Sequence, residues 1–214
     1  MNTTESTQKK RILLGGAVIT GLFFIFLAFS FDSSTVARWD QSVNAALVAT
    51  PWVLQGSTFL HVLFETPAMI VLGTLITWSL WSTRRHRKAL IFAGALMVNF
   101  VGIEALKALI HRARPAEMLI AETSFSFPSG HAAIAVVFCG LVAALLLPKV
   151  KRTSLRILLA VAATLLALFT GVSRLYLHVH WASDVLAGML WGSCVLCLAL
   201  YFLEKKPDKQ RERK

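Results

Sequence analysis

Three short stretches of this sequence hold most of the side chains that could do chemistry. They are KALIHRARP at 107–115, PSGH at 128–131 and SRLYLHVHWASD at 173–184. Each combines basic or small polar residues with histidine, and the third also supplies a carboxylate. Fixed cations bind phosphate, and histidine is a common nucleophile and general acid or base. The residue types therefore indicate chemistry on a phosphoryl group.

Five residues in these stretches are suited to hold a phosphate. Lys107, Arg114 and Arg174 supply three positive charges, and arginine can bind phosphate through two hydrogen bonds. Ser129 supplies a hydroxyl donor, and Gly130 lets the backbone approach a ligand closely. The backbone amides that open the helix expected here, together with its dipole, also favour an anion. We predict that these five residues bind the phosphoryl oxygens.

Two histidines and an aspartate are the candidate catalytic residues. His180 and Asp184 are four residues apart, which makes them neighbours on one face of a helix. Asp184 can then accept a hydrogen bond from one ring nitrogen of His180 and leave the other nitrogen free to attack phosphorus. His131 remains as the general acid that protonates the leaving oxygen.

A metal site is the competing interpretation of the third stretch. His178 and His180, with Asp184, could supply part of a zinc-binding set. No convincing further ligands follow, because His111 and His131 lie among cations. We therefore expect neither a metal nor another cofactor, and we interpret His178 as a polar residue at the rim of the site.

The polar residues between the first two stretches receive simpler interpretations. Glu117 and Glu122 are expected to be solvated charges of a loop. Arg112 and His111 either touch a lipid headgroup or lie in the lipid interface, and the sequence does not separate these alternatives.

The elements that must position these residues are transmembrane helices. Hydrophobic residues make up 56% of the 214 residues, and only 15% are charged. A helix needs about 20 mostly apolar residues to cross a bilayer. We predict an all-α, integral membrane bundle of six transmembrane helices in a single domain, 1–214, with the motif core at 107–184. The predicted spans are 12–31, 64–82, 89–110, 129–148, 157–176 and 182–203.

The basic residues predict the orientation of the bundle. The net charge is +11, and most of the 22 Lys and Arg residues fall in four short clusters beside apolar runs, at 9–11, 84–88, 149–156 and 205–214. This is the pattern of cytoplasmic loops, and it argues against a nucleic-acid partner. We expect both tails, 1–11 and 204–214, in the cytoplasm of a multi-pass cell-membrane protein, and the chemical groups on the outer side.

The first outer loop, 32–63, contains an amphipathic segment. Val36, Trp39, Val43 and Leu47 recur at helical spacing, with polar residues between them. We predict a helix that lies in the membrane interface and acts either as a packing lid or as a guide for a lipid.

Together, the three stretches resemble the type 2 phosphatidic acid phosphatase family of the lipid phosphatase/haloperoxidase superfamily. The family pattern is K-x6-RP, then PSGH, then SR-x5-H-x3-D. Every position of this pattern is present: Lys107, Arg114, Pro115, Pro128, Ser129, Gly130, His131, Ser173, Arg174, His180 and Asp184. The resemblance implies metal-independent hydrolysis through a phosphohistidine on His180, with His131 acting first as acid and then as activator of water.

The expected function is therefore that of an integral membrane lipid phosphatase. Its compact size resembles bacterial phosphatidylglycerophosphatase B-type enzymes and undecaprenyl diphosphate phosphatases. The motifs contact only the phosphoryl group, so phosphatidylglycerol phosphate, phosphatidate and undecaprenyl diphosphate stay open as substrates. The expected partners are the lipid phosphate and the membrane, and no obligatory protein partner is evident. A membrane transporter or channel for an anionic lipid or solute is the alternative, because it would also carry charges within the membrane.

Overall fold

A computed structural model describes residues 3–48 and 50–204, and within these ranges the chain is helical with no strand. The prediction of an all-α fold is confirmed. The elements are α1 (Thr3–Ser30), α2 (Ser34–Ala46), α3 (Pro51–Leu63), α4 (Thr66–Ser82), α5 (His86–Ile110), α6 (Gly130–Leu146), the short 3-10 helix η1 (Leu147–Lys149), α7 (Thr153–Tyr176) and α8 (Ala182–Leu203).

The long helices have the length and apolarity of membrane spans. In the described part of the chain, five helical segments can each cross a bilayer alone: α1, α5, α6 with η1, α7 and α8. A sixth crossing is possible where α3 and α4, bent by 53° at a short break, act as one span. The predicted multi-pass bundle is therefore confirmed.

Most predicted boundaries lie within a few residues of the helices. The span predicted at 182–203 coincides with α8. The largest difference is at the first span, because α1 begins at Thr3 and makes most of the predicted N-terminal tail helical. The predicted C-terminal tail lies outside the described residues, except for Glu204.

The loop at 32–63 contains two helices rather than the one predicted. The amphipathic segment forms α2 as expected, and Ser33 caps it by accepting a hydrogen bond from the Val36 amide. The second helix, α3, was not predicted. Proline is favoured in the first turn of a helix, and Pro51 begins α3.

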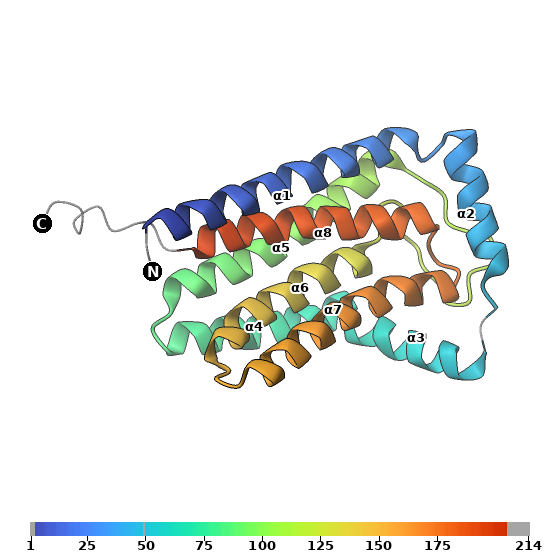
Figure 1. The fold of residues 1–214 in the computed structure, drawn as a ribbon. Coiled ribbons are helices and arrows are strands. Elements are labelled where there is room, and N and C mark those ends of the chain that lie inside the picture. The colour runs from blue at the N-terminus through green and yellow to red at the C-terminus, as the bar shows by residue number, and fades with distance from the viewer. Residues whose placement is uncertain (1–2, 49, 205–214) are drawn as a thin grey trace, which may run out of the picture.

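The helices pack closely where α6 meets α8. In Figure 1, α6 lies centrally between α7 and α8, and α1 runs along α8. Gly188 lies so close to α6 that a Cβ there would be 2.3 Å from the carbonyl oxygen of Ser129. A Cβ at Gly192 would be 2.6 Å from the carbonyl oxygen of Ala133. These two glycines therefore let the starts of α6 and α8 touch through their backbones.

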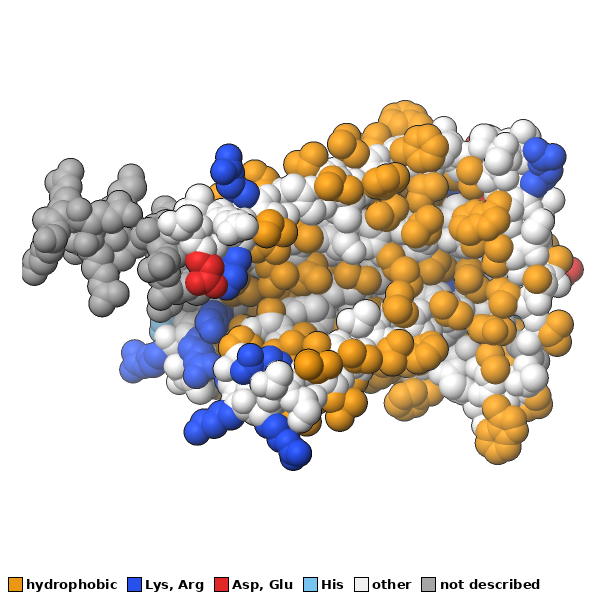
Figure 2. Space-filling model, viewed as in Figure 1, with side chains coloured by type: hydrophobic (Ala, Val, Ile, Leu, Met, Phe, Trp, Pro, Cys, Tyr) orange, Lys and Arg blue, Asp and Glu red, His pale blue; other side chains and the backbone are white. Residues whose placement is uncertain are grey.

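The two ends of the bundle differ in charge. The basic clusters at 9–11, 84–88 and 149–156 lie at the start of α1 and at the turns before α5 and α7. Figure 1 places these points at the end where the chain termini lie, and Figure 2 shows basic side chains gathered there beside an apolar surface. The fourth cluster lies outside the described residues. The starts of α6 and α8 lie at the opposite end.

Candidate active site

The three chemical stretches meet at the end of the bundle away from the termini. The Ser129 amide donates a hydrogen bond of 3.0 Å to the Asp184 carbonyl oxygen, which joins the second stretch to the third. Arg114 Nη1 donates a hydrogen bond of 2.7 Å to the Val179 carbonyl oxygen, which joins the first to the third. The fold therefore brings together residues that are up to 77 positions apart in the sequence.

His180 is buried beside Asp184 and faces an arginine. Its Nδ1 lies 3.5 Å from Asp184 Oδ2 and makes no hydrogen bond within the described residues. Its Nε2 lies 3.3 Å from Arg114 Nη1. Burial lowers the pKa of His180 to about 4, although Asp184 opposes the shift. The imidazole is therefore neutral at pH 7. The distance between its Nδ1 and Asp184 Oδ2 can shorten to that of a hydrogen bond when a ligand binds.

A network of ionic and polar side chains holds Asp184. Its carboxylate accepts hydrogen bonds from Arg112, from the Ser126 hydroxyl and, at 2.8 Å, from the Trp181 amide at the start of α8. Arg112 also pairs with Asp40 of α2, where Nη2 and Oδ2 are 2.7 Å apart. The sequence left open whether Arg112 touches a lipid headgroup or lies in the lipid interface. In the structure it bridges two carboxylates that are almost completely buried, so its role is structural.

Asp40 was not among the predicted residues. It accepts hydrogen bonds from the Ser183 amide at 2.8 Å and from the Ser183 hydroxyl at 2.6 Å, and it is 1% exposed. Asp40 lies among the polar residues of the amphipathic helix that we expected in the membrane interface. Its partners come from α8 and from the segment after α5, so α2 is anchored to the site rather than lying free at the interface.

The three predicted cations are buried in this region. Arg174 is fully buried, and the Arg114 side chain is 5% exposed. Lys107 Nζ donates a hydrogen bond of 3.0 Å to Ser124 Oγ, and Arg114 Nε donates one of 2.7 Å to the Ser124 carbonyl oxygen. The loop before PSGH thus fixes two of the cations in place.

Glu122 is not a solvated loop charge, and that prediction was wrong. Its Oε1 lies 2.9 Å from Arg174 Nη2, and its Oε2 lies 3.4 Å from Arg114 Nη2. The carboxylate therefore occupies the position between two arginines where the sequence predicts a phosphate. The pair with Arg174 joins the loop to α7, and the pair with Arg114 joins it to the segment after α5.

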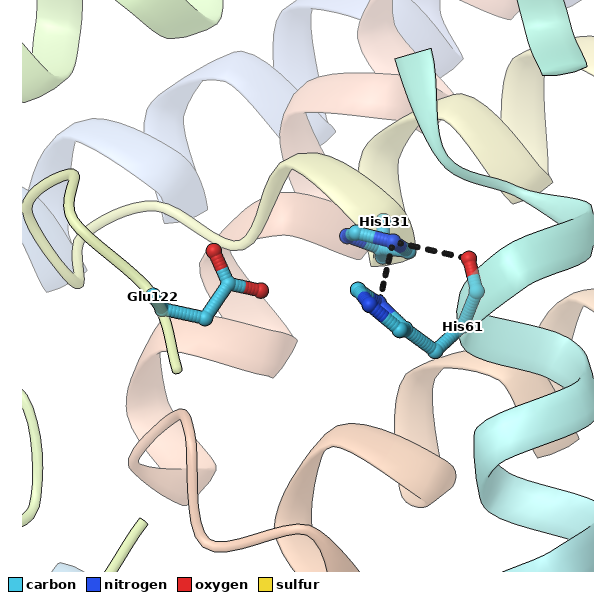
Figure 3. A group of neighbouring side chains, drawn as sticks. All are labelled: His61, Glu122 and His131. Carbon is cyan, nitrogen blue, oxygen red and sulfur yellow. Dashed lines mark hydrogen bonds between the residues drawn. The ribbon is translucent and has the colours of Figure 1, made fainter. Parts of the chain in front are cut away.

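His61 is a further site residue that the sequence analysis missed. It comes from the last turn of α3, and its Nδ1 lies 3.2 Å from His131 Nε2 and 3.0 Å from Arg174 Nη1. Figure 3 shows the two imidazoles against each other, with Glu122 reaching toward them from its loop. The unpredicted helix α3 carries this residue, so no signal pointed to it.

Within the described residues, one group of side chains could hold a metal ion. It consists of His61, Glu122 and His131. One ligand atom from each lies within 4.8 Å of the others. However, Arg174 lies 3.0 Å from His61 Nδ1 and 2.9 Å from Glu122 Oε1. A metal ion here would face a buried guanidinium, so this group suits a bound anion better than a bound cation.

Ser129 and Gly130 form the start of α6. The Ser129 side chain is fully buried and accepts a hydrogen bond of 3.5 Å from the Ala132 amide, so it caps the helix. Gly130 is the first helical residue, and a Cβ there would contact Ile103 at 3.4 Å. His131 follows directly. The helix start thus combines a cap with a position facing the cations.

The remaining histidines lie at the edges of this region. His178 Nδ1 lies 3.1 Å from Asn44 Oδ1 of α2, which agrees with a rim position. His111 is exposed and packs edge-on against Phe125, with ring centroids 4.5 Å apart.

A groove of about 930 Å³ leads from the site along α4 and α5. At one end it is lined by Lys107, Arg114 and the three histidines His61, His131 and His180. Beyond them, apolar residues of α4 and α5 form its walls, including Ile70, Trp78, Met97 and Phe100, which are exposed on the outside of the bundle. The groove therefore connects the polar site with the surface that faces lipid.

Comparisons with known proteins identify the family of this chain. Residues 88–208 match the PAP2 superfamily. The chain is 32% identical over 200 residues to phosphatidylglycerophosphatase B of Bacillus subtilis, covering 90% of this chain and 94% of the relative. It is 37% identical over 91 residues to an undecaprenyl-diphosphatase of Sulfolobus acidocaldarius, covering 42% of this chain and 40% of that protein.

Solved structures are also similar, including the two that follow. One is the first transmembrane PAP2 type phosphatidylglycerolphosphate phosphatase from Bacillus subtilis, with a TM-score of 0.82, 28% identity and coverage of 90% of this chain and 98% of that one. The other is Aquifex aeolicus LpxE, with a TM-score of 0.62, 22% identity and coverage of 79% and 96%. The second likeness concerns the fold alone.

Proposed function

The chain belongs to the PAP2 superfamily and is a membrane lipid phosphatase, and from this premise we propose that it acts through a phosphohistidine on His180. The substrate we propose first is phosphatidylglycerol phosphate, ahead of phosphatidate and undecaprenyl diphosphate. The reason is that the relative matched over 94% of its length is named a phosphatidylglycerophosphatase. The observation that carries the mechanism is a buried His180 with Nδ1 beside Asp184 and Nε2 toward Arg114.

The first step is attack by His180 Nε2 on phosphorus. A nitrogen–phosphorus bond forms while the bond from phosphorus to the lipid oxygen breaks, and His131 gives its proton to that leaving oxygen. In the second step His131 takes a proton from water, whose oxygen attacks phosphorus and releases phosphate and a neutral His180. Asp184 holds the imidazole in orientation throughout.

The phosphoryl oxygens bind among Lys107, Arg114, Arg174 and the start of α6 at Ser129 and Gly130. These groups are preorganised and largely buried, so they stabilise the charge of the transition state without a large rearrangement. The lipid phosphate takes the place of the Glu122 carboxylate. No metal has a role in this scheme.

The groove supports a lipid substrate rather than a soluble one. A headgroup at the cations leaves its chains beside apolar walls that open toward the lipid-facing surface. We place the basic end of the bundle, with both termini, in the cytoplasm, because basic loops are retained there. The site then lies on the outer side, and a protease added to intact cells should leave a C-terminal tag uncut.

The decisive experiment is phosphate release by purified protein in detergent from a panel of lipid phosphates. His180→Ala should lose activity by at least about 1,000-fold, because the nucleophile is absent. His178→Ala is the matched control in the same loop and should stay active, since that side chain contacts Asn44 at the rim. Wild-type protein that binds these lipids without releasing phosphate would instead be a transporter. Substantial activity in His180→Ala would refute the nucleophile assignment.

A further inference from the structure

The break between α3 and α4 frees a backbone carbonyl from its helical partner. In an unbroken helix, the carbonyl oxygen of His61 would accept a hydrogen bond from the amide of Glu65. Here α3 ends at Leu63, and the Glu65 amide donates instead to the carbonyl oxygen of Val62 at 3.4 Å. The carbonyl oxygen of His61 lies 3.3 Å from Nε2 of His131. The end of α3 therefore presents an acceptor to the candidate general acid.

The side chain of His61 presents a second acceptor to the same nitrogen. Its Nδ1 lies 3.0 Å from Nη1 of Arg174, and arginine can only donate hydrogen bonds. Nδ1 of His61 is therefore the acceptor in this contact, and the proton of this neutral ring is on Nε2. The same Nδ1 lies 3.2 Å from Nε2 of His131. Figure 3 shows that both contacts of His131 with residue 61 end at one nitrogen.

These contacts determine which nitrogen of His131 is protonated. The carbonyl oxygen of His61 and Nδ1 of this tautomer are acceptors only, so Nε2 of His131 must carry a hydrogen. Nδ1 of His131 makes no hydrogen bond within residues 3–48 and 50–204, and His131 lines the groove. Nδ1 of His131 is therefore the nitrogen that is free to exchange a proton with a ligand.

We propose that His61 is a positioning residue for the general acid: it holds Nε2 of His131, so that Nδ1 gives the proton to the leaving oxygen. This inference rests on the proposed function and adds to it a residue and the reacting nitrogen. As the bond from phosphorus to the lipid oxygen breaks, the Nδ1 proton passes to that oxygen. His131 becomes a neutral ring that keeps its Nε2 proton, and Nδ1 then takes a proton from the water that attacks the phosphohistidine. A group that fixes the tautomer of a catalytic histidine in this way acts as the aspartate of a serine triad does.

His61 also joins the acid to a cation of the phosphate site. Arg174 uses Nη1 for His61 and Nη2 for Glu122, at 3.0 and 2.9 Å. A phosphate that takes the place of Glu122 leaves the contact between Arg174 and His61 intact. The lone pair of His61 Nδ1 then lies between two positive groups, Arg174 and protonated His131, and reduces their repulsion. A test of the proposal must therefore separate an effect on the acid from an effect on phosphate binding.

The leaving group makes this separation. An alkoxide needs a proton in order to leave, whereas a nitrophenolate is a stable anion that leaves without one. We would measure kcat/KM in detergent micelles for a diacylglycerol phosphate and for a nitrophenyl phosphate that carries a long alkyl chain. His61→Leu keeps the bulk of the side chain but removes the acceptor. It should lower kcat/KM by about 10- to 100-fold on the lipid phosphate and by less than about 3-fold on the nitrophenyl ester.

His61→Asn is the conservative variant that should restore activity. Asparagine Oδ1 is an acceptor at the same position along the side chain as histidine Nδ1, so kcat/KM on the lipid phosphate should return to within about 3-fold of the wild type. Ser57→Ala is the matched control, because Ser57 is also buried and lies one turn earlier on α3. It should leave both rates unchanged.

Three outcomes would overturn this inference alone: an equal loss on both substrates in His61→Leu, no loss on the lipid phosphate, or no recovery in His61→Asn. Activity on the nitrophenyl ester shows in the same assay that a variant is folded. If His61→Leu does not fold, His61→Ala replaces it and the same outcomes apply. No phosphate release by the wild type from either substrate would overturn the proposed function and this inference with it.

Discussion

In the proposed site, the carboxylate of Glu122 competes with the substrate phosphate for two arginines, and its removal should tighten phosphate binding. The carboxylate lies 2.9 Å from Arg174 and 3.4 Å from Arg114. A phosphate that binds between these guanidinium groups must first displace it. Glu122→Gln keeps the size and one acceptor oxygen of the side chain but removes its charge, so the competitor becomes weaker.

The expected magnitude follows from the geometry of these pairs. One of the two contacts is short and the other is long, and the Glu122 side chain is 19% exposed, so solvent screens part of the attraction. A net contribution of about 1–2 kcal/mol is then reasonable for the displaced interaction. Phosphate should bind about 5- to 30-fold more tightly to the variant.

The assay is the inhibition constant of inorganic phosphate, measured together with KM for the lipid in detergent micelles. Glu117→Gln is the matched control, because Glu117 lies in the same loop, is exposed and forms no ion pair within the described residues. It removes the same charge from the loop and should change neither constant. Phosphate binding that is unchanged or weaker in Glu122→Gln would refute the competition, because Glu122 would then support the arginines instead.

Three further outcomes are expected. The lowered pKa of His180, about 4, keeps its neutral and attacking form at mildly acid pH, so kcat/KM should persist at pH 5–6 and fall only as the pH drops through about 4. The proposed mechanism also requires protonated His131, so the full profile should be bell-shaped, and a profile flat from acid to base would count against both roles. Activity should survive EDTA, whereas complete loss that zinc restores would favour a metal held by the His61 group. Asp40→Asn should lower the melting temperature through a loss of about 1.5–3 kcal/mol, because a buried carboxylate that binds Arg112 becomes neutral. Asp32→Asn, at an exposed carboxylate on the preceding turn, should melt like the wild type.

The helices were predictable because hydropathy and charge mark them locally. The span at 182–203 was correct at both ends, since polar residues bound a long apolar run there. The helix α3 was not predictable in this way, because it is short and its first residue, Pro51, also suits the end of the preceding helix. Loop helices of this kind are stabilised by packing against the bundle rather than by a signal of their own.

The motif residues could be predicted from their spacing, but their partners could not. Glu122 pairs with Arg174 across 52 positions, and His61 meets His131 across 70. Asp40 reaches Arg112 across 72. Such pairs depend on how loops fold over the end of the bundle, and no local pattern encodes that arrangement. The sequence would look the same if these side chains lay in solvated loops, so it could not show that they are paired.

The contact between Gly188 and Ser129 also limits how this protein can change during evolution. A single methyl group at Gly188 would lie 2.3 Å from a backbone oxygen, and backbone cannot turn aside as a side chain can. Selection should therefore keep glycine at this position in descendants that retain the same helix contact, even though Gly188 is outside the recognised motif. In lineages that replace this glycine, we expect either a shifted α8 or a loss of phosphatase activity.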